Sequence, residues 1–160
     1  MLVTMAMAGF WSIESGEIRF GKDGRWYSDD EWIENPRIAL LFSRHLLQRD
    51  DGSWWIVMGD ERAQVVIEDT PWVVVRVDGS PAAGFTLGLN DGSSEPLDAG
   101  SLSLAPDHVL YGQAKEGRHR IRFLRAPQME LLAHADEEAG AYFLPGPGAE
   151  RWPLRSPDVH

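Results

Sequence analysis

The residues best suited to acid–base chemistry flank one short run with the composition of a strand. An Asp-Glu pair ending at Glu61 precedes the run 62–67, and Glu68 and Asp69 follow it. Two neighbouring carboxylates can serve as general acid and general base. If the run is a strand, however, it separates the two pairs by roughly 20 Å, at about 3.3 Å per residue. This spacing argues against one catalytic site, and the following Thr-Pro predicts Asp69 to be a turn residue that accepts bonds from nearby backbone N–H groups.

Basic residues that could seat an anion alternate along the segment RHRIRFLR. Arg118, Arg120 and Arg122 share one face if the segment is a strand. The guanidinium group offers a planar fork of donors that matches carboxylates and phosphates. Pairing with the acidic surplus of the chain is the alternative interpretation, and each exposed pair of that kind contributes little stability.

Patterns that would hold a metal or a cofactor are missing from the sequence. The chain has no cysteine, and its five histidines show no metal-ligand spacing. His45 lies on the apolar stripe of a predicted helix, where packing is the better interpretation. There is no P-loop, no G-x-G-x-x-G and no G-x-S-x-G. We therefore expect no metal and no cofactor.

Charge and composition exclude several classes of partner. The formal net charge of the 160 residues is −10, which disfavours nucleic acids and anionic membrane surfaces. No apolar run is long enough to cross a bilayer, and the apolar start MLVTMAMAGFW has no Lys or Arg ahead of it, unlike a signal peptide. Since the absence of cysteine also suits a reducing compartment, we expect a cytoplasmic protein.

The elements that must position these residues are mostly strands. Asn35 and Pro36 predict a helix start. The apolar stripe of this helix holds Ile38, Leu41, Phe42, His45 and Leu46, of which Leu41, Phe42 and Leu46 are predicted to be buried, and the helix is predicted to end near Gln48. A second helix is predicted from Pro127, with Met129 and Leu132 inward. Hairpins are predicted at 16–28 and 107–125, strands at 53–58, 62–68 and 72–79 as an antiparallel meander, and further strands at 85–89 and 141–145.

These elements predict an α+β fold: a strand-rich antiparallel meander with hairpins and two helices. We expect residues 1–160 to form a single unit, with a division into two halves, if any, inside the Gly- and Ser-rich segment 79–100. The proline-rich tail 146–160 is predicted to be irregular.

Several of these runs together resemble a bacterial family catalogued as domain of unknown function 1285. The runs are DGRWY, PRIALLFSRHLLQRDDGSWWIV and VIEDTPWVVV, followed by LYGQAK and RFLRAPQMELL. The resemblance covers residues 16 to 135 and implies a strand-rich α+β fold without an assigned activity. The positions that match the family pattern are Asp23, Trp26, Arg37, Glu61, Glu68, Asp69, Pro71, Tyr111, Lys115 and Arg125.

From the charged members of that set we predict a ligand site. Its candidate residues are Arg37, Glu61, Glu68, Asp69, Lys115 and Arg125. The favoured function is a non-catalytic module that binds an anionic small molecule or a protein partner. The alternative is a hydrolase or transferase that uses Glu61, Glu68 or Asp69 with Arg or Lys helpers, so whether the chain is an enzyme stays open at this point. Assembly as a homodimer is also open.

Overall fold

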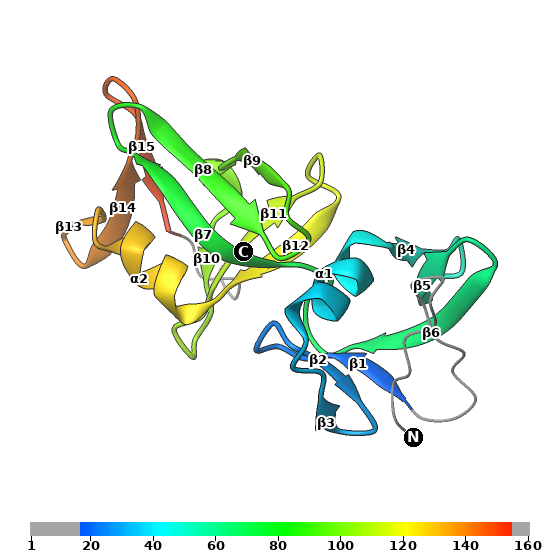
Figure 1. Cartoon of the computed structure of the whole chain (residues 1–160). Coiled ribbons are helices and arrows are strands. Elements are labelled where there is room, and N and C mark those ends of the chain that lie inside the picture. Colours follow the sequence, from blue (N-terminus) through cyan, green and yellow to red (C-terminus); the bar gives the residue numbers. More distant parts are fainter. Residues whose placement is uncertain (1–16, 155–160) are drawn as a thin grey trace. The chain divides into compact units, whose positions relative to one another are not determined.

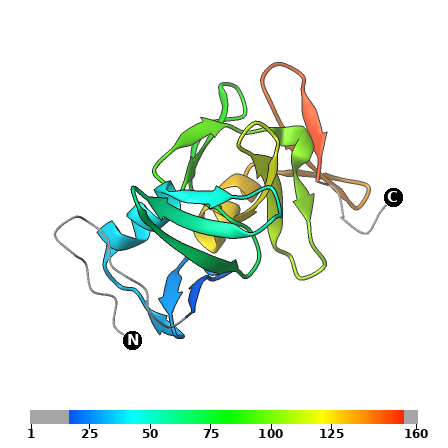
Figure 2. The same cartoon turned by 90° about the vertical axis from the view of Figure 1, so that its right-hand side faces the viewer.

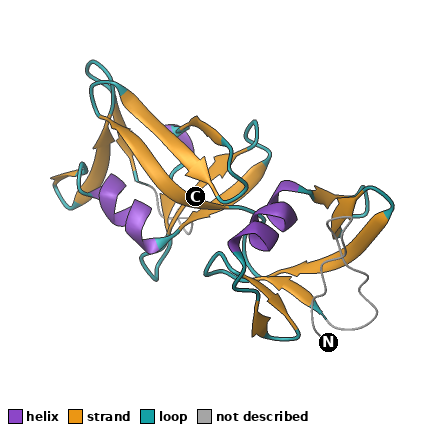
Figure 3. Cartoon of the chain, viewed as in Figure 1, coloured by secondary structure: helices purple, strands orange, loops and turns teal. Residues whose placement is uncertain are grey.

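Strands are the predominant secondary structure among the residues that the structure, a computed structural model, describes, namely 17–154 (Figure 1 and Figure 3). Two α-helices accompany the strands in this range, which confirms the predicted α+β class. The chain divides into two compact units between Pro71 and Trp72. The segment 79–100, where we expected any division, contributes β8 and β9 to the second unit.

The first unit is built on a six-stranded sheet with the order β3-β2-β1-β6-β5-β4. Its elements are β1 Ile18–Phe20, β2 Trp26–Ser28, β3 Glu31–Trp32, α1 Pro36–Arg44, β4 Leu46–Gln48, β5 Trp54–Met58 and β6 Glu61–Ile67. The predicted hairpin at 16–28 is β1 with β2, and β4, β5 and β6 form an antiparallel meander. The two halves of the sheet join through a parallel pair, β1 with β6.

The core of the first unit lies between one face of this sheet and α1 (Figure 1 and Figure 2). Trp26 is 1% exposed, and its ring lies 4.8 Å from that of Phe20 and 5.4 Å from that of Phe42 on the helix. Its indole N–H donates to the Ser43 hydroxyl at 2.9 Å. The buried aromatic cluster therefore carries its own polar partner, as a buried tryptophan requires.

Helix α1 begins as predicted and ends earlier than predicted. The Asn35 side chain accepts a hydrogen bond from the Arg37 backbone N–H at 2.9 Å, and Pro36 occupies the first turn. The helix ends at Arg44 instead of near Gln48, because Leu46–Gln48 pair with β5 as strand β4. Phe42 and Leu46 are buried as predicted, from the helix and from this strand respectively, whereas Leu41 is only half-buried.

The second unit is built on another six-stranded sheet, with the order β10-β11-β12-β7-β8-β9, and a three-stranded sheet β13-β14-β15. Its elements are β7 Val73–Ser80, β8 Gly84–Leu89, β9 Ser94–Pro96, the 3-10 helix η1 Ala99–Ser101, β10 Ser103–Leu104, β11 Leu110–Ala114, β12 His119–Phe123, α2 Arg125–Leu132, β13 Asp136–Glu138, β14 Ala141–Pro145 and β15 Arg151–Pro153. The predicted hairpin at 107–125 is β11 with β12.

Both six-stranded sheets follow the same path. In each, three antiparallel strands are followed by a helix and three more antiparallel strands, and the first strand of the set pairs in parallel with the last: β1 with β6, and β7 with β12. The predicted meander that joined 53–58, 62–68 and 72–79 is therefore wrong in its last step. The segment 72–79 opens the second sheet, because its parallel partner is β12.

Helix α2 begins at Arg125, before the predicted start at Pro127. This register turns Pro127 and Leu131 inward, one helical turn apart, and leaves Met129 60% exposed, so the prediction that Met129 is buried is wrong. Part of the tail predicted to be irregular is ordered, since Trp152 pairs with Leu144 where β15 joins β14. Residues 155–160 lie outside the described range.

Candidate functional site

The four predicted site residues of the first unit are dispersed over it. Glu61 begins β6 and Glu68 follows its end, so these two carboxylates lie at opposite ends of one strand, as predicted. Arg37 is exposed in the first turn of α1, and Asp69 follows Glu68 in the chain. This arrangement does not place the carboxylates of the hydrolase alternative in one acid–base pair.

Glu68 is held by its neighbours in the first unit. Its carboxylate accepts hydrogen bonds from the Arg19 side chain at 3.1 Å and from the Lys22 backbone N–H at 2.9 Å. Arg19 also lies over the Tyr27 ring, at 4.3 Å, and reaches Asp30 at 3.3 Å. Glu68 thus ties the β1–β2 hairpin to the end of β6, a structural role.

Lys115, in the second unit, is also held by contacts within its own unit. Its ammonium donates to Asp91 at 2.5 Å and to the Ser93 hydroxyl at 3.2 Å, and it lies 4.8 Å from the centroid of the Trp72 ring. Its backbone N–H donates to Glu95. Burial is the largest influence on Asp91 and raises the pKa of its carboxyl, but the bonds from Lys115 and Ser93 outweigh it and leave that pKa below the usual value. Lys115 therefore clamps two turns together.

The predicted basic stripe of β12 folds onto a tyrosine. Arg122 and Tyr111 are cross-strand partners, and the Arg122 guanidinium donates to the Tyr111 hydroxyl at 3.1 Å. Arg120 covers the same ring at 3.6 Å, while Arg118 pairs with Glu116 at 2.9 Å. Arg125, the last of the six predicted residues, is exposed at the start of α2.

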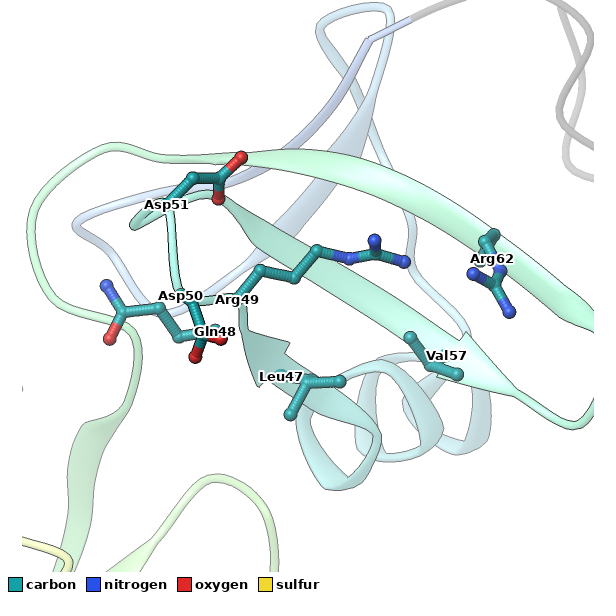
Figure 4. A pocket seen from close by; sticks show the side chains of 7 residues that line it. All are labelled: Leu47, Gln48, Arg49, Asp50, Asp51, Val57 and Arg62. Carbon is teal, nitrogen blue, oxygen red and sulfur yellow. The ribbon is translucent and has the colours of Figure 1, made fainter.

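A groove in the first unit brings together a different set of residues, which we call the arginine groove. It has a volume of 620 Å³, within the range of small-molecule sites. It is lined by Leu47, Gln48, Arg49, Asp50, Asp51, Val57 and Arg62. These residues come from β4, the turn that follows it, β5 and β6 (Figure 4).

The sheet places the walls of the groove on one face. Val57 and Arg62 are cross-strand partners between β5 and β6, and Leu47 is the partner of Trp55 between β4 and β5. Cross-strand partners share a face, and so do residues two apart on a strand, so Leu47, Trp55, Val57 and Arg62 all project on the side opposite to the buried Ile56. The apolar floor and one arginine thus follow from strand alternation.

The second arginine is fixed by a chain of contacts through the β4–β5 turn. Asp51 accepts hydrogen bonds from both the backbone N–H and the hydroxyl of Ser53, and the Ser53 hydroxyl accepts one from the Trp55 indole N–H at 2.8 Å. The guanidinium of Arg49 then lies over the Trp55 ring at 4.5 Å. The hydrogen bond from Ser53 is the main reason that the pKa of Asp51 lies below its usual value. The turn therefore holds both an anion and a cation in fixed places.

The charges of the arginine groove are segregated. Figure 4 shows the Arg49 side chain extending toward Arg62, with Leu47 and Val57 beside them and Asp50 and Asp51 at the other end. Within residues 17–154, neither arginine makes an ion pair shorter than 4.0 Å. Two guanidinium groups without a carboxylate partner above an aliphatic floor can bind the anionic group of an amphiphilic ligand.

None of the six predicted site residues lines this groove. Arg49 follows the predicted helix end near Gln48, and Arg62 opens the predicted strand 62–68, so neither was a candidate site residue. Strand alternation in 54–58 and 61–67 could have indicated part of the groove. If β4, β5 and β6 are assumed to form a meander, the outward-facing positions place Arg62 beside Trp55 and Val57. The position of Arg49 depends on the turn, which the sequence does not specify.

Two further properties bear on function. Over the described range 17–154, no three His, Cys, Asp or Glu side chains are grouped so that they could hold a metal ion. No helix in that range is long and apolar enough to span a membrane.

Comparison with known proteins gives one family. Residues 11–70 match the model of the N-terminal domain of DUF1285, a domain of unknown function. A DUF1285 family protein from Silicibacter pomeroyi DSS-3 has a similar structure, with a TM-score of 0.66 and 20% identity over 89% of this chain and 81% of that one. Another from Shewanella baltica OS155 has a TM-score of 0.53 and 21% identity over 71% and 88% of the two chains. No curated protein matches the sequence.

Proposed function

Because this chain is a member of the DUF1285 family, whose description names no activity, we propose its function from its own site: it is a non-catalytic module that binds a small organic anion in the arginine groove. The groove lies within residues 47–62, inside the segment that matches the family's N-terminal domain. The proposal concerns the first unit alone.

One observation carries the proposal: two guanidinium groups share a groove and, within the described residues, neither has a carboxylate partner. In a chain with 25 acidic and 15 basic residues, carboxylates are in excess, so surface arginines have an ample supply of partners. Arg49 is instead held over Trp55, 4.5 Å from its centroid. A cation held in advance of binding loses less conformational entropy when the anion arrives.

The lining also selects the rest of the ligand. Leu47 and Val57 offer an aliphatic surface next to the guanidinium groups, which suits an alkyl chain. Asp50 and Asp51 repel a second anionic group at the other end. The ligand class is therefore a monoanion with an aliphatic body, such as an alkyl carboxylate, whose charged head lies between Arg49 and Arg62.

The positions of the carboxylate side chains favour a binding function over a hydrolytic one. The enzyme alternative needs Glu61, Glu68 or Asp69 beside the ligand, and none of them lines the groove. Glu68 is bound to Arg19 and to the Lys22 backbone, so its carboxylate is committed. The acids that do line the groove, Asp50 and Asp51, neighbour the β4–β5 turn, where Asp51 is bound to Ser53.

The test is a titration of the full chain with octanoate, followed by isothermal calorimetry and by backbone amide shifts. We expect shifts concentrated at residues 47–62, and we expect Arg49→Gln and Arg62→Gln each to weaken binding about tenfold, the effect of losing about 1.4 kcal/mol of charge-assisted bonding. Octyl phosphate in place of octanoate distinguishes a phosphate head from a carboxylate head.

Arg37→Gln is the matched control, since Arg37 is an exposed arginine of the same unit outside the groove. It should leave octanoate affinity unchanged, and 1-octanol should bind no better to the original chain than to Arg62→Gln. If octanoate fails to bind, or if Arg37→Gln weakens it as much as Arg62→Gln does, the proposal is wrong.

A further inference from the structure

A second cavity lies in the other unit and is independent of the arginine groove. It has a volume of 470 Å³ and is bounded by β8, the segment from Pro96 to Gly100, and the β14–β15 hairpin. The hairpin passes beside the start of β8, where Pro147 approaches Gly84 (Figure 1). We call this cavity the tryptophan pocket, after the Trp152 ring in its wall.

The base of the tryptophan pocket is apolar. Phe85 and Leu144 line it and are 8% and 1% exposed, and Leu97 and Pro147 add further apolar surface. Leu144 and Trp152 are cross-strand partners between β14 and β15, so their side chains share one face of that hairpin. An apolar body can therefore be covered on several sides here.

Two glycines lie close to the indole of Trp152 at the pocket wall. A Cβ atom on Gly100 would lie 3.5 Å from Cζ3 of the ring, and one on Gly146 would lie 3.2 Å from its Nε1. The first separation is an ordinary contact, while the second is tighter than most Cβ contacts. The absence of a side chain at Gly146 thus makes room for the nitrogen edge of the ring.

A carboxylate lies near each of these two glycines. Oε2 of Glu150 lies 3.2 Å from the Cβ position of Gly146, and Oδ1 of Asp98 lies 3.6 Å from that of Gly100. Asp98 precedes η1 without capping it through its side chain. Within residues 17–154, neither carboxylate makes an ion pair, and no Lys or Arg lines the pocket.

We infer that the tryptophan pocket binds a small organic cation, an alkylammonium with a short apolar body. The indole face attracts a cation through its quadrupole, and tryptophan is the best of the aromatic side chains in this respect. Glu150 and Asp98, which line the pocket beside the two glycines that contact the ring, add the opposite charge, and Phe85 and Leu144 cover the alkyl part. The free amine and the lysine side chain of a peptide present the same chemistry.

The experiment uses n-butylammonium with the full chain and follows the indole N–H resonance of Trp152, assigned by its loss in Trp152→Phe. We expect this resonance to shift in a saturable way. Glu150→Gln and Asp98→Asn, which preserve shape and remove charge, should each weaken binding at least threefold, and the double variant should abolish it. The amide-capped lysine Nα-acetyl-lysine-N-methylamide serves as the peptide arm: tighter binding than butylammonium assigns the cation to a peptide, and weaker binding assigns it to a free amine.

Glu130→Gln is the matched control, because Glu130 is exposed on α2 in the same unit and does not line the pocket. It should bind butylammonium as the original chain does, and 1-butanol should not shift the Trp152 resonance. The inference is overturned if butylammonium produces no saturable shift, if the double variant still binds, or if butanol binds equally well. Thermal midpoints of the variants show that the fold is retained.

Discussion

At the scale of single residues, the charged side chains discussed above fall into two classes. Some have ion-pair partners within the fold, and others have none among the described residues. Lys115 and Glu68 belong to the first class, since the Lys115 ammonium donates to Asp91 and Ser93, and the Glu68 carboxylate accepts from the Arg19 side chain and the Lys22 backbone N–H. Arg49 and Arg62 belong to the second class within the described residues. This difference, which depends on neighbours far away in sequence, separates structural charges from candidate ligand contacts.

The ion pair between Asp91 and Lys115 should make the free energy of unfolding depend on pH in the acidic range. The folded-state pKa of Asp91 lies below its usual value of 3.8, so the unfolded chain binds the proton more readily. Its contribution to the free energy of unfolding is therefore complete above about pH 4 and is lost as the pH falls through the folded-state pKa. Thermal midpoints measured between about pH 2.5 and 6 should show a shallower acid decline for Asp91→Asn than for the original chain.

Asp60→Asn, at an exposed aspartate of the β5–β6 turn, is the control and should reproduce the acid decline of the original chain. Equal declines for all three proteins would contradict the assignment. At neutral pH, Lys115→Met should lower the free energy of unfolding by about 2 kcal/mol, because it removes the donor to a carboxylate that is only 10% exposed.

At the scale of elements, α1 shows what local sequence determines and what it does not. The Asn35-Pro36 start is encoded locally, because the cap and the first-turn proline act within three residues. The C-terminal end of the helix is not encoded locally. The apolar stripe continues through Leu46, but Leu46 pairs with Ile56 and therefore belongs to strand β4. The buried face that results is narrow, with Phe42 and Ser43 as its buried residues.

Because the buried face of α1 is narrow, two alanine substitutions in this helix should lower the free energy of unfolding by very different amounts. Phe42→Ala should lower the free energy of unfolding by about 3–5 kcal/mol, because the ring is 1% exposed and packs edge-on against Trp26. Leu40→Ala, at a position 37% exposed, should cost under about 1 kcal/mol. Urea denaturation measures both, and similar losses would contradict the packing of α1.

The same contrast between local and distant causes explains how far the sequence could predict the fold and the site. Hairpins such as β11–β12 are encoded by alternation and a Gly turn, and the structure contains them. The parallel pairs join strands from the two ends of a unit, so no local pattern specified them. The arginine groove depends on the ring contact between Arg49 and Trp55 across a turn, which residue types alone do not reveal.

At the scale of the whole molecule, the two units have separate sheets and separate cores. Phe20, Trp26 and Phe42 are buried in the first, and Leu110 and Ile121 in the second. The two proposed sites follow this division, with an anion site in the first unit and a cation site in the second. Each site should therefore respond mainly to changes in its own unit.

Separate cores predict local responses in hydrogen exchange. Phe42→Ala should lower amide protection chiefly in residues 17–71, and Ile121→Ala, at a fully buried position, chiefly in residues 72–154. Mass spectrometry of peptides after timed exchange measures this directly. A uniform loss of protection across the chain in both variants would show instead that the protein opens as one cooperative body.

The parallel pairing of β1 with β6 also has a consequence for how the chain acquires its structure during synthesis. Ile18 in β1 pairs with Val65 in β6, so β1 must wait until the last strand of its sheet has been synthesised before its second edge is paired. Until then β1 is paired on one side only, within the short three-stranded set β1-β2-β3. The second sheet repeats the delay, because Val73 meets Arg122 only after the intervening strands have been made. Contacts of such long sequence separation slow folding, so each unit should close late and in one step, the first unit before the second.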